Sequence, residues 1–188
     1  MKPILPVLNF DPVLLLKAQP VRLAIFDVDG VLTDGSIYLS DQGETLKRFH
    51  THDGLGMKLL ARAGIVPAVI SGRDSAALRA RLAALGVEHF TLGTEVKLGA
   101  AETLLDTLGM DWSQAAVMGD DWPDLPLMQR ATVSAAPPQA HPQALACADH
   151  VTRASGGFGA AREFCDLLLV ATGRYAALLD ALDGGASS

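Results

Sequence analysis

Aspartates follow directly on an apolar stretch near the start of the chain, in the run "LAIFDVDGVLTDG". Asp27 and Asp29 stand one residue apart after four apolar residues, and a second run, "GDDWPD", holds Asp120, Asp121 and Asp124. Clustered carboxylates repel one another, so a cluster of this kind is favourable when a cation joins it. The ligands on offer are oxygens, with no cysteine or histidine in these runs. They therefore fit Mg²⁺ and not zinc.

Two further runs carry polar groups that suit phosphate chemistry. Ser71, Gly72 and Arg73 follow a second apolar stretch, and Lys97 precedes a helical pattern after a third. In open α/β sheets, ligands bind beyond the carboxyl ends of the strands. We therefore expect carboxylates, a hydroxyl and an ammonium to meet in one crevice, although each run alone also fits an ordinary turn or helix cap.

The chain between these runs alternates apolar, β-branched segments with helical patterns, which is typical of stacked βα units. Strands are expected at Val21–Phe26, Ile65–Ile70, His89–Leu92, Ala115–Met118, Thr132–Ser134 and His150–Thr152. Nearly all of these segments are apolar, as in a parallel sheet covered by helices on both faces. The pattern predicts an α/β fold with a doubly wound, mainly parallel, Rossmann-like sheet.

Capping residues predict where the helices begin and end. Asp53 is expected to cap a helix that stops at Gly64. Asp74 or Ser75 is expected to cap the next helix, which stops at Gly86. Short polar side chains favour the first position of a helix and glycine favours the position after its end, which gives the chain a consistent punctuation.

One segment, "GSIYLSDQGETLKRFH", breaks this alternation. Two strand-like halves flank Asp41-Gln42-Gly43, a turn signal, and predict a β-hairpin. The segment begins just after the first acidic run, so the hairpin should project from the same end of the sheet. A lone hairpin is marginally stable in water and is expected to lean on something, such as another subunit. A decorative loop is the alternative.

Composition limits the class of protein. The chain has 188 residues, of which 49% are hydrophobic and 19% charged, as expected for one globular domain. The net charge of −6, without a basic cluster, argues against nucleic-acid binding. The longest apolar run near the N-terminus, Val13–Leu16, is too short to span a membrane. Cys147 and Cys165 are too few for a disulfide framework, and we expect a cytoplasmic protein without membrane contact.

The order of the polar runs resembles a known pattern. "DVDGVLTDG", "ISGRDS", Lys97 and "GDDWPD" are similar to the four motifs of the haloacid dehalogenase superfamily. The hairpin, "FHTHDGLGMKLL" and "ASGGFGAAREFCDLLL" extend the likeness to the 3-deoxy-D-manno-octulosonate 8-phosphate phosphatases. The resemblance implies a phosphatase domain at residues 21–183 without a separate cap domain, an N-terminal extension at 1–20 and a flexible tail at 184–188. It also implies a homotetramer with the hairpins at its core.

The resemblance implies a chemical role for each motif residue. Asp27 would attack phosphorus and form an aspartyl-phosphate, while Asp29 would protonate the leaving alkoxide and then deprotonate a water. Ser71 would donate a hydrogen bond to the phosphoryl group, and Lys97 would offset its charge.

The same resemblance implies how Mg²⁺ is bound. Asp27, Asp120 and the backbone carbonyl of Asp29 would be its ligands. Asp121 and Asp124 would orient the water molecules around the metal ion. These roles account for the placement of carboxylates against the end of a core strand, because the strand is a rigid mount for them.

The implied substrate is a phosphorylated sugar acid, 3-deoxy-D-manno-octulosonate 8-phosphate, a precursor of lipopolysaccharide. The family often has an arginine where this chain has His52, and a histidine cannot bind a carboxylate bidentately. His52 either donates to the sugar acid or is only a loop residue, and both interpretations stay open. Arg73, beside Gly72, is the better candidate for an anionic group. A phosphatase for a nine-carbon sialic-acid-type 9-phosphate is the near alternative, and a receiver-like phosphoacceptor signalling domain is the remote one.

Overall fold

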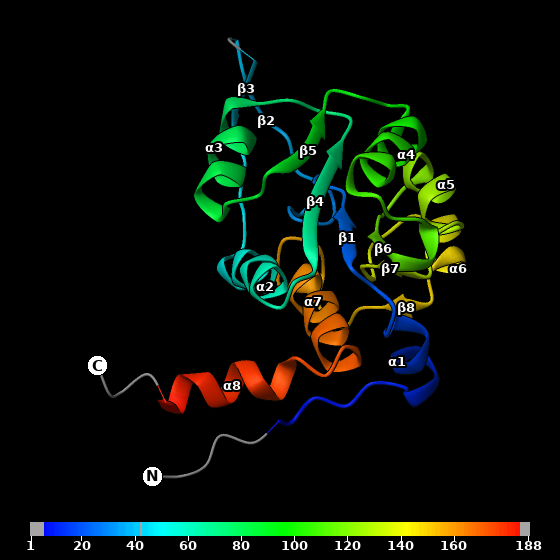
Figure 1. Ribbon diagram of the computed structural model, residues 1–188. Coiled ribbons are helices and arrows are strands. Elements are labelled where there is room, and N and C mark those ends of the chain that lie inside the picture. The colour runs from blue at the N-terminus through cyan, green and yellow to red at the C-terminus, as the bar shows by residue number, and fades with distance from the viewer. Residues whose placement is uncertain (1–5, 42, 185–188) are drawn as a thin grey trace.

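The computed structural model describes residues 6–41 and 43–184, and within them one parallel sheet forms the centre of the molecule (Figure 1). Its six strands lie in the order β5-β4-β1-β6-β7-β8. The bounds are β1 Leu23–Phe26, β4 Val66–Ser71, β5 His89–Leu92, β6 Ala115–Met118, β7 Val133–Ala136 and β8 His150–Val151. The predicted α/β fold with a parallel sheet is confirmed, and the expected strands match these bounds to within about two residues.

Helices cover both faces of this sheet. Their bounds are α1 Pro12–Ala18, α2 Thr51–Arg62, α3 Ala76–Leu85, α4 Lys97–Leu108, α5 Leu125–Met128, α6 Pro142–Cys147, α7 Ala160–Ala171 and α8 Tyr175–Gly184. Two short 3₁₀ turns lie at Trp112–Gln114 and Trp122–Asp124. No helix among the described residues is long and apolar enough to cross a membrane.

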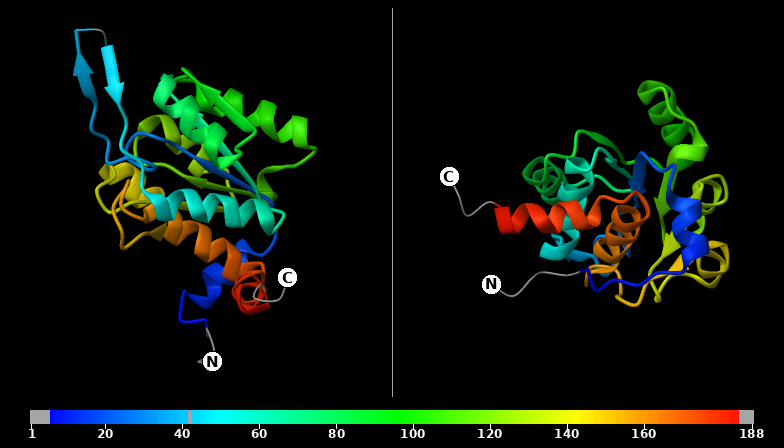
Figure 2. Two further views of the ribbon diagram at one scale, coloured as in Figure 1. Left: turned by 90° about the vertical axis from the view of Figure 1, so that its left-hand side faces the viewer. Right: turned by 60° about the horizontal axis from the view of Figure 1, so that its bottom comes forward.

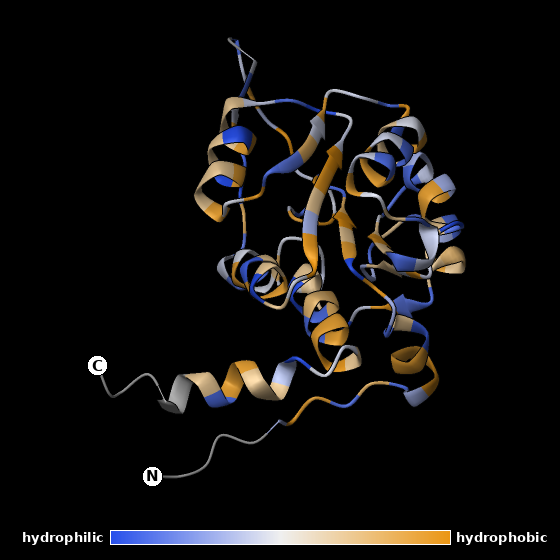
Figure 3. Ribbon diagram, in the orientation of Figure 1, coloured by the Kyte–Doolittle hydropathy of each residue, from blue (hydrophilic) through white to orange (hydrophobic). Residues whose placement is uncertain are grey.

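The two faces of the sheet have separate hydrophobic cores. Ala24 and Phe26 of β1 pack with residues of α1, α2, α3 and α7, whereas Leu23 and Ile25 pack with residues of α4, α5 and α6. This division follows from the alternation of side chains along a strand. The apolar residues of β1, β4 and α7 appear as orange ribbon in the interior of the molecule (Figure 3).

Strand β1 lies in the middle of the sheet, between β4 and β6, and its last residue pairs with residues of both. Phe26 is in register with Val69 on one side and with Met118 on the other. The chain continues this pairing for one further bond, from the Asp27 N–H to the Met118 carbonyl, 3.0 Å. Asp27 is therefore fixed at the carboxyl end of a buried strand in the middle of the sheet.

The predicted hairpin is present and projects from the sheet (Figure 2). Strands β2, Tyr38–Ser40, and β3, Gly43–Leu46, pair in antiparallel fashion. Gln42, in the middle of the predicted turn, lies outside the described residues. Apolar side chains on this hairpin are solvent-exposed, among them Leu39 at 71% and Leu46 at 55%.

The prediction that Asp53 caps its own helix is wrong. Helix α2 begins at Thr51 after His50, and the His50 side chain does not cap it. Asp53 is buried, and its Oδ1 accepts a hydrogen bond of 2.8 Å from the backbone N–H of Arg162 in the first turn of α7. Asp53 therefore satisfies a free N–H group of another helix, 109 residues away in the chain.

Of the two predicted caps of α3, Asp74 and Ser75, the structure shows Ser75. Its Oγ accepts from the Leu78 N–H at 3.3 Å, whereas Asp74 forms an ion pair of 2.5 Å with Arg79. The serine hydroxyl can reach the N–H group at the third helical position, which is the usual capping geometry.

The segment before residue 21 contributes to the fold through α1. This helix packs against α7 and β7, and its residues Leu14 and Ala18 are buried in the hydrophobic core. An ion pair of 2.5 Å joins Lys17 to Asp149. The domain limits at residues 20 and 183 stay predictions, and residues 185–188 of the expected tail lie outside the described residues.

We predict that Asp53→Ala lowers the free energy of unfolding by about 1 kcal/mol, because the Arg162 N–H loses its acceptor. Chemical denaturation followed by circular dichroism measures the change. Asp106→Ala, at an exposed position of α4, is the matched control and should shift it by less than about 0.5 kcal/mol. Equal stabilities of the Asp53→Ala variant and the unaltered protein would contradict the capping role.

Candidate active site

A cavity of about 790 Å³ lies at the carboxyl ends of the strands. It brings together every predicted site residue except His52, and these are Asp27, Asp29, Ser71, Gly72, Arg73, Lys97, Asp120, Asp121 and Asp124. Glu95 and Pro123 complete its lining. The residues lie at or just beyond the carboxyl ends of β1, β4 and β6 and on the connection from β5 to the start of α4, as the sheet topology predicts.

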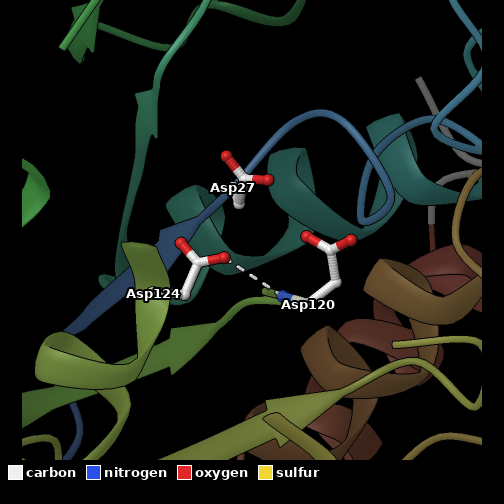
Figure 4. A group of neighbouring side chains, drawn as sticks. All are labelled: Asp27, Asp120 and Asp124. Atoms are coloured by element: carbon white, nitrogen blue, oxygen red, sulfur yellow. Dashed lines mark hydrogen bonds between the residues drawn. The ribbon is translucent and has the colours of Figure 1, made fainter. Parts of the chain in front are cut away.

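Three carboxyl groups face one another inside the cavity (Figure 4). Asp27, Asp120 and Asp124 each place an oxygen atom within 4.8 Å of the other two. We call these three residues the acidic triad. Asp27 and Asp124 are buried and Asp120 is half-buried, so water does little to screen their repulsion. An all-oxygen set of this kind fits a hard cation such as Mg²⁺.

The ammonium group of Lys97 lies between two members of the acidic triad. Its Nζ donates to Asp27 Oδ1 at 2.6 Å and to Asp124 Oδ1 at 2.7 Å. Burial alone would lower the pKa of Lys97, but the carboxylates of Asp27 and Asp124 outweigh burial and raise it. Lys97 is therefore a permanent cation that compensates part of the negative charge.

The three carboxylates of the acidic triad still repel one another, because Lys97 compensates only one negative charge. Burial, followed by the charge of Asp124, raises the pKa of Asp27 to about 6. Burial and the charges of Asp27 and Asp124 raise the pKa of Asp120 to about 8. A divalent cation bound here would remove the repulsion that raises both pKa values.

The loop that carries Asp120 and Asp124 is closed by hydrogen bonds of its own. Asp124 Oδ2 accepts from the backbone N–H of Asp120 at 3.1 Å and of Asp121 at 3.3 Å. Asp121 caps the 3₁₀ turn Trp122–Asp124. Asp124 thus fixes the loop with one oxygen atom and binds Lys97 with the other.

Asp29 has a partner that the sequence analysis missed. The ammonium of Lys47, just beyond β3, donates a short hydrogen bond to Asp29 Oδ1 and lies 3.2 Å from Glu44 Oε1. The Lys47 side chain is only 1% exposed, and Arg73 Nε lies 4.0 Å from the other oxygen of Asp29. Lys47 directly follows the exposed residues Thr45 and Leu46 of β3, and nothing in that pattern indicates a buried lysine.

Ser71 and His52 differ in their relation to the site. Ser71 is buried at the end of β4, and its Oγ accepts a hydrogen bond of 3.2 Å from the Arg73 N–H, which leaves its own proton free for a ligand. His52 is exposed in the first turn of α2 and packs edge-on against His50, with ring centres 4.9 Å apart. Within one chain, the structure does not bring His52 to the cavity.

Comparison with known proteins gives the same family from sequence and from structure. Residues 94–162 match the haloacid dehalogenase-like hydrolase family. The chain is 44% identical, over 84% of each sequence, to the 3-deoxy-D-manno-octulosonate 8-phosphate phosphatase KdsC of Escherichia coli K12.

Solved structures support this relationship. The 3-deoxy-D-manno-octulosonate 8-phosphate phosphatase of Moraxella catarrhalis, in complex with magnesium, phosphate and KDO, is 37% identical with a TM-score of 0.87. The alignment covers 90% of this chain and 98% of that one. A hypothetical protein of Xanthomonas campestris is 39% identical over 99% of this chain and 100% of its own, with a TM-score of 0.88. The chain therefore belongs to the haloacid dehalogenase-like hydrolases and, among them, to the family of the 3-deoxy-D-manno-octulosonate 8-phosphate phosphatases.

Proposed function

We propose that the protein is a Mg²⁺-dependent phosphomonoesterase that hydrolyses 3-deoxy-D-manno-octulosonate 8-phosphate and so contributes to lipopolysaccharide precursor synthesis. The observation that carries this proposal is the acidic triad joined to Lys97 at the end of β1. A relative of 44% identity is named for this reaction, and a related structure holds magnesium, phosphate and the sugar acid. The receiver-like alternative has no support, because the chain belongs to a hydrolase family.

Asp27 is the proposed nucleophile. Its backbone is fixed by the bond to Met118, and Lys97 holds its carboxylate in one orientation. In-line attack by an Asp27 oxygen on phosphorus gives an aspartyl-phosphate and releases the sugar-acid alkoxide, so one difficult displacement becomes two easier ones. Asp27, Asp120 and the carbonyl of Asp29 are the proposed ligands of Mg²⁺, which when bound neutralises charge on the phosphoryl oxygens.

Asp29 is the proposed general acid and base. It is two residues from Asp27 on the same loop, and it lines the same cavity. It would give a proton to the leaving alkoxide and later take one from the water that hydrolyses the aspartyl-phosphate, a role that contributes about 10²–10⁴-fold in rate. The Lys47 ammonium holds Oδ1 of Asp29. The other oxygen atom, Oδ2, lies on the side of Arg73 and is the proposed site of proton transfer.

Ser71 and Arg73 are the proposed contacts to the substrate, together with the backbone at Gly72. The Ser71 hydroxyl has its proton available for a phosphoryl oxygen. Arg73 is half-exposed at the cavity, and a guanidinium there can bind the carboxylate of a sugar acid bidentately. The homotetramer and the cytoplasmic location stay predictions, and the exposed apolar side chains of the hairpin favour an assembly.

The substrate is tested by release of inorganic phosphate with Mg²⁺ and with a chelator. We expect metal-dependent release from 3-deoxy-D-manno-octulosonate 8-phosphate that exceeds release from a sialic-acid-type 9-phosphate and from an aryl phosphate. Greater release from the nine-carbon compound would transfer the proposal to that substrate. Activity on the aryl phosphate alone would retain the chemistry and reject the sugar acid.

We predict that Asp27→Asn lowers kcat by more than about 10³-fold, because the amide is a poor nucleophile. Its thermal unfolding midpoint should not fall, since a carboxylate is removed from a crowded cluster. Asp106→Asn, on the exposed surface of α4, is the matched control and should retain full activity. Phosphate release by the Asp27→Asn variant at the rate of the control would refute the nucleophile assignment.

We predict that Mg²⁺ binds the metal-free protein more tightly as pH rises from about 6 to about 8, and that binding releases protons. The raised pKa values, about 6 for Asp27 and about 8 for Asp120, mean that protons compete with the metal ion below these values. Isothermal titration calorimetry in buffers of different ionisation enthalpy measures both quantities. An affinity that is constant across this range would show that the triad carries no such protons.

A further inference from the structure

The loop between β7 and α6, residues 137–141, contacts both loops that carry the acidic triad. The Gln139 side chain donates from Nε2 to the carbonyl oxygen of Gly30 at 2.7 Å. Two residues later, the backbone N–H of His141 donates to the carbonyl oxygen of Asp120 at 2.8 Å. One short segment therefore holds the backbone after β1 and the backbone after β6 in a fixed relation.

The oxygen atom of the Gln139 amide binds a third segment of the chain, which contains Gly156. This Oε1 accepts a hydrogen bond of 3.1 Å from the backbone N–H of Gly156. Gly156 lies so close to Gly30 that a Cβ atom at this position would be 1.8 Å from the Gly30 carbonyl oxygen. The amide thus uses its donor and its acceptor to hold Gly30 against residues 156–159, the glycine-rich segment.

Gly30 in turn determines the geometry of the proposed metal site. Its φ of +91° favours glycine, and a Cβ atom there would lie 2.1 Å from Asp120 Oδ2. The Gly30 N–H donates to Thr33 Oγ1 at 3.4 Å, while its carbonyl binds Gln139. Thr33 therefore holds the peptide that contains the Asp29 carbonyl, and Gln139 holds the next peptide, between Gly30 and Val31. A shift of Gly30 would move that carbonyl and disturb Asp120 at the same time.

We propose that Gln139 is a positioning residue of the Mg²⁺ site, which acts by fixing the Gly30–Val31 peptide and, through the Gly30 backbone, the adjoining Asp29 carbonyl. Gln139 lines no part of the cavity and so acts through Gly30, not on the substrate. The inference rests on the proposed function, because it concerns the same metal ion. Partners that orient metal ligands from outside typically change metal affinity by about 10–100-fold, and solvent reaches Gln139, so we expect the lower figure of about 10-fold.

The test titrates the metal-free, full-length protein with Mg²⁺ in a calorimeter, without substrate. Gln139→Met keeps the length of the side chain and removes both hydrogen bonds. Gln139→Glu keeps an acceptor for Gly156 but directs an oxygen atom at the Gly30 carbonyl. Gln143→Met and Gln143→Glu, at an exposed position in α6, are the matched controls.

Both Gln139 variants should raise the Kd for Mg²⁺ by about 10-fold, while both controls stay within about twofold of the unaltered protein. The Gln139→Glu variant separates positioning from simple charge, because an added carboxylate acting only through its charge would lower the Kd. In phosphate-release assays, saturating Mg²⁺ should restore most of kcat to the Gln139 variants. Their unfolding midpoints without metal are measured in parallel.

Two outcomes overturn the inference and are distinguishable. If the unaltered protein binds Mg²⁺ and both Gln139 variants bind it equally well, Gln139 does not position the site, whatever happens to the unfolding midpoints. If the unaltered protein itself fails to bind Mg²⁺, the proposed function fails and the inference fails with it. If the Gln139→Met variant does not fold, the Gln139→Glu variant decides the result, because it retains the bond to Gly156.

Discussion

The site depends on holding three carboxylates together, of which Asp27 and Asp124 are buried and Asp120 is half-buried. Lys97 makes this arrangement tolerable, because its ammonium contacts Asp27 and Asp124 at hydrogen-bond distance. The lysine reaches them from the first residue of α4, and the carboxylates come from loops after β1 and β6. Because one ammonium contacts carboxylates from two loops, Lys97 joins α4 to the loops after β1 and β6 in one geometry. The proposed chemistry uses the negative charge that one lysine leaves uncompensated.

Close approach of the backbone is the second requirement, and glycine provides it. A Cβ atom at Gly30 would collide with Asp120, and one at Gly119 would lie 2.3 Å from the Cβ of Asp124. The carboxylates therefore occupy space that other residue types would fill. Gly157 meets the same requirement, since a Cβ atom there would lie 2.6 Å from the backbone nitrogen of Asp34. Positions without side chains are as necessary to this site as the charged residues.

Local patterns were sufficient to predict the sheet and the loops that carry the site, because strand periodicity and strand-end polar runs are properties of neighbouring residues. Contacts between distant segments were not predictable in this way. Aspartate is a common capping residue, yet the Asp53 carboxylate accepts its hydrogen bond from Arg162 in α7 and not from its own helix. Lys47 follows the exposed residues of the hairpin, and its ion pair with Asp29 forms only in the folded chain. Both contacts depend on how segments far apart in the sequence pack against each other.

Helix α7 has a consequence for the synthesis of the protein. Nine of its 12 residues are buried, and it packs on α1 and α2 over the side of the sheet that carries Phe26. All strands of the sheet precede it in the chain. A nascent chain that has completed the sheet but not α7 therefore exposes one apolar face and leaves the Asp53 carboxylate without its helix. Because domains emerge from the ribosome N-terminal end first, the interval before α7 appears is when the chain is most open to aggregation and to capture by chaperones.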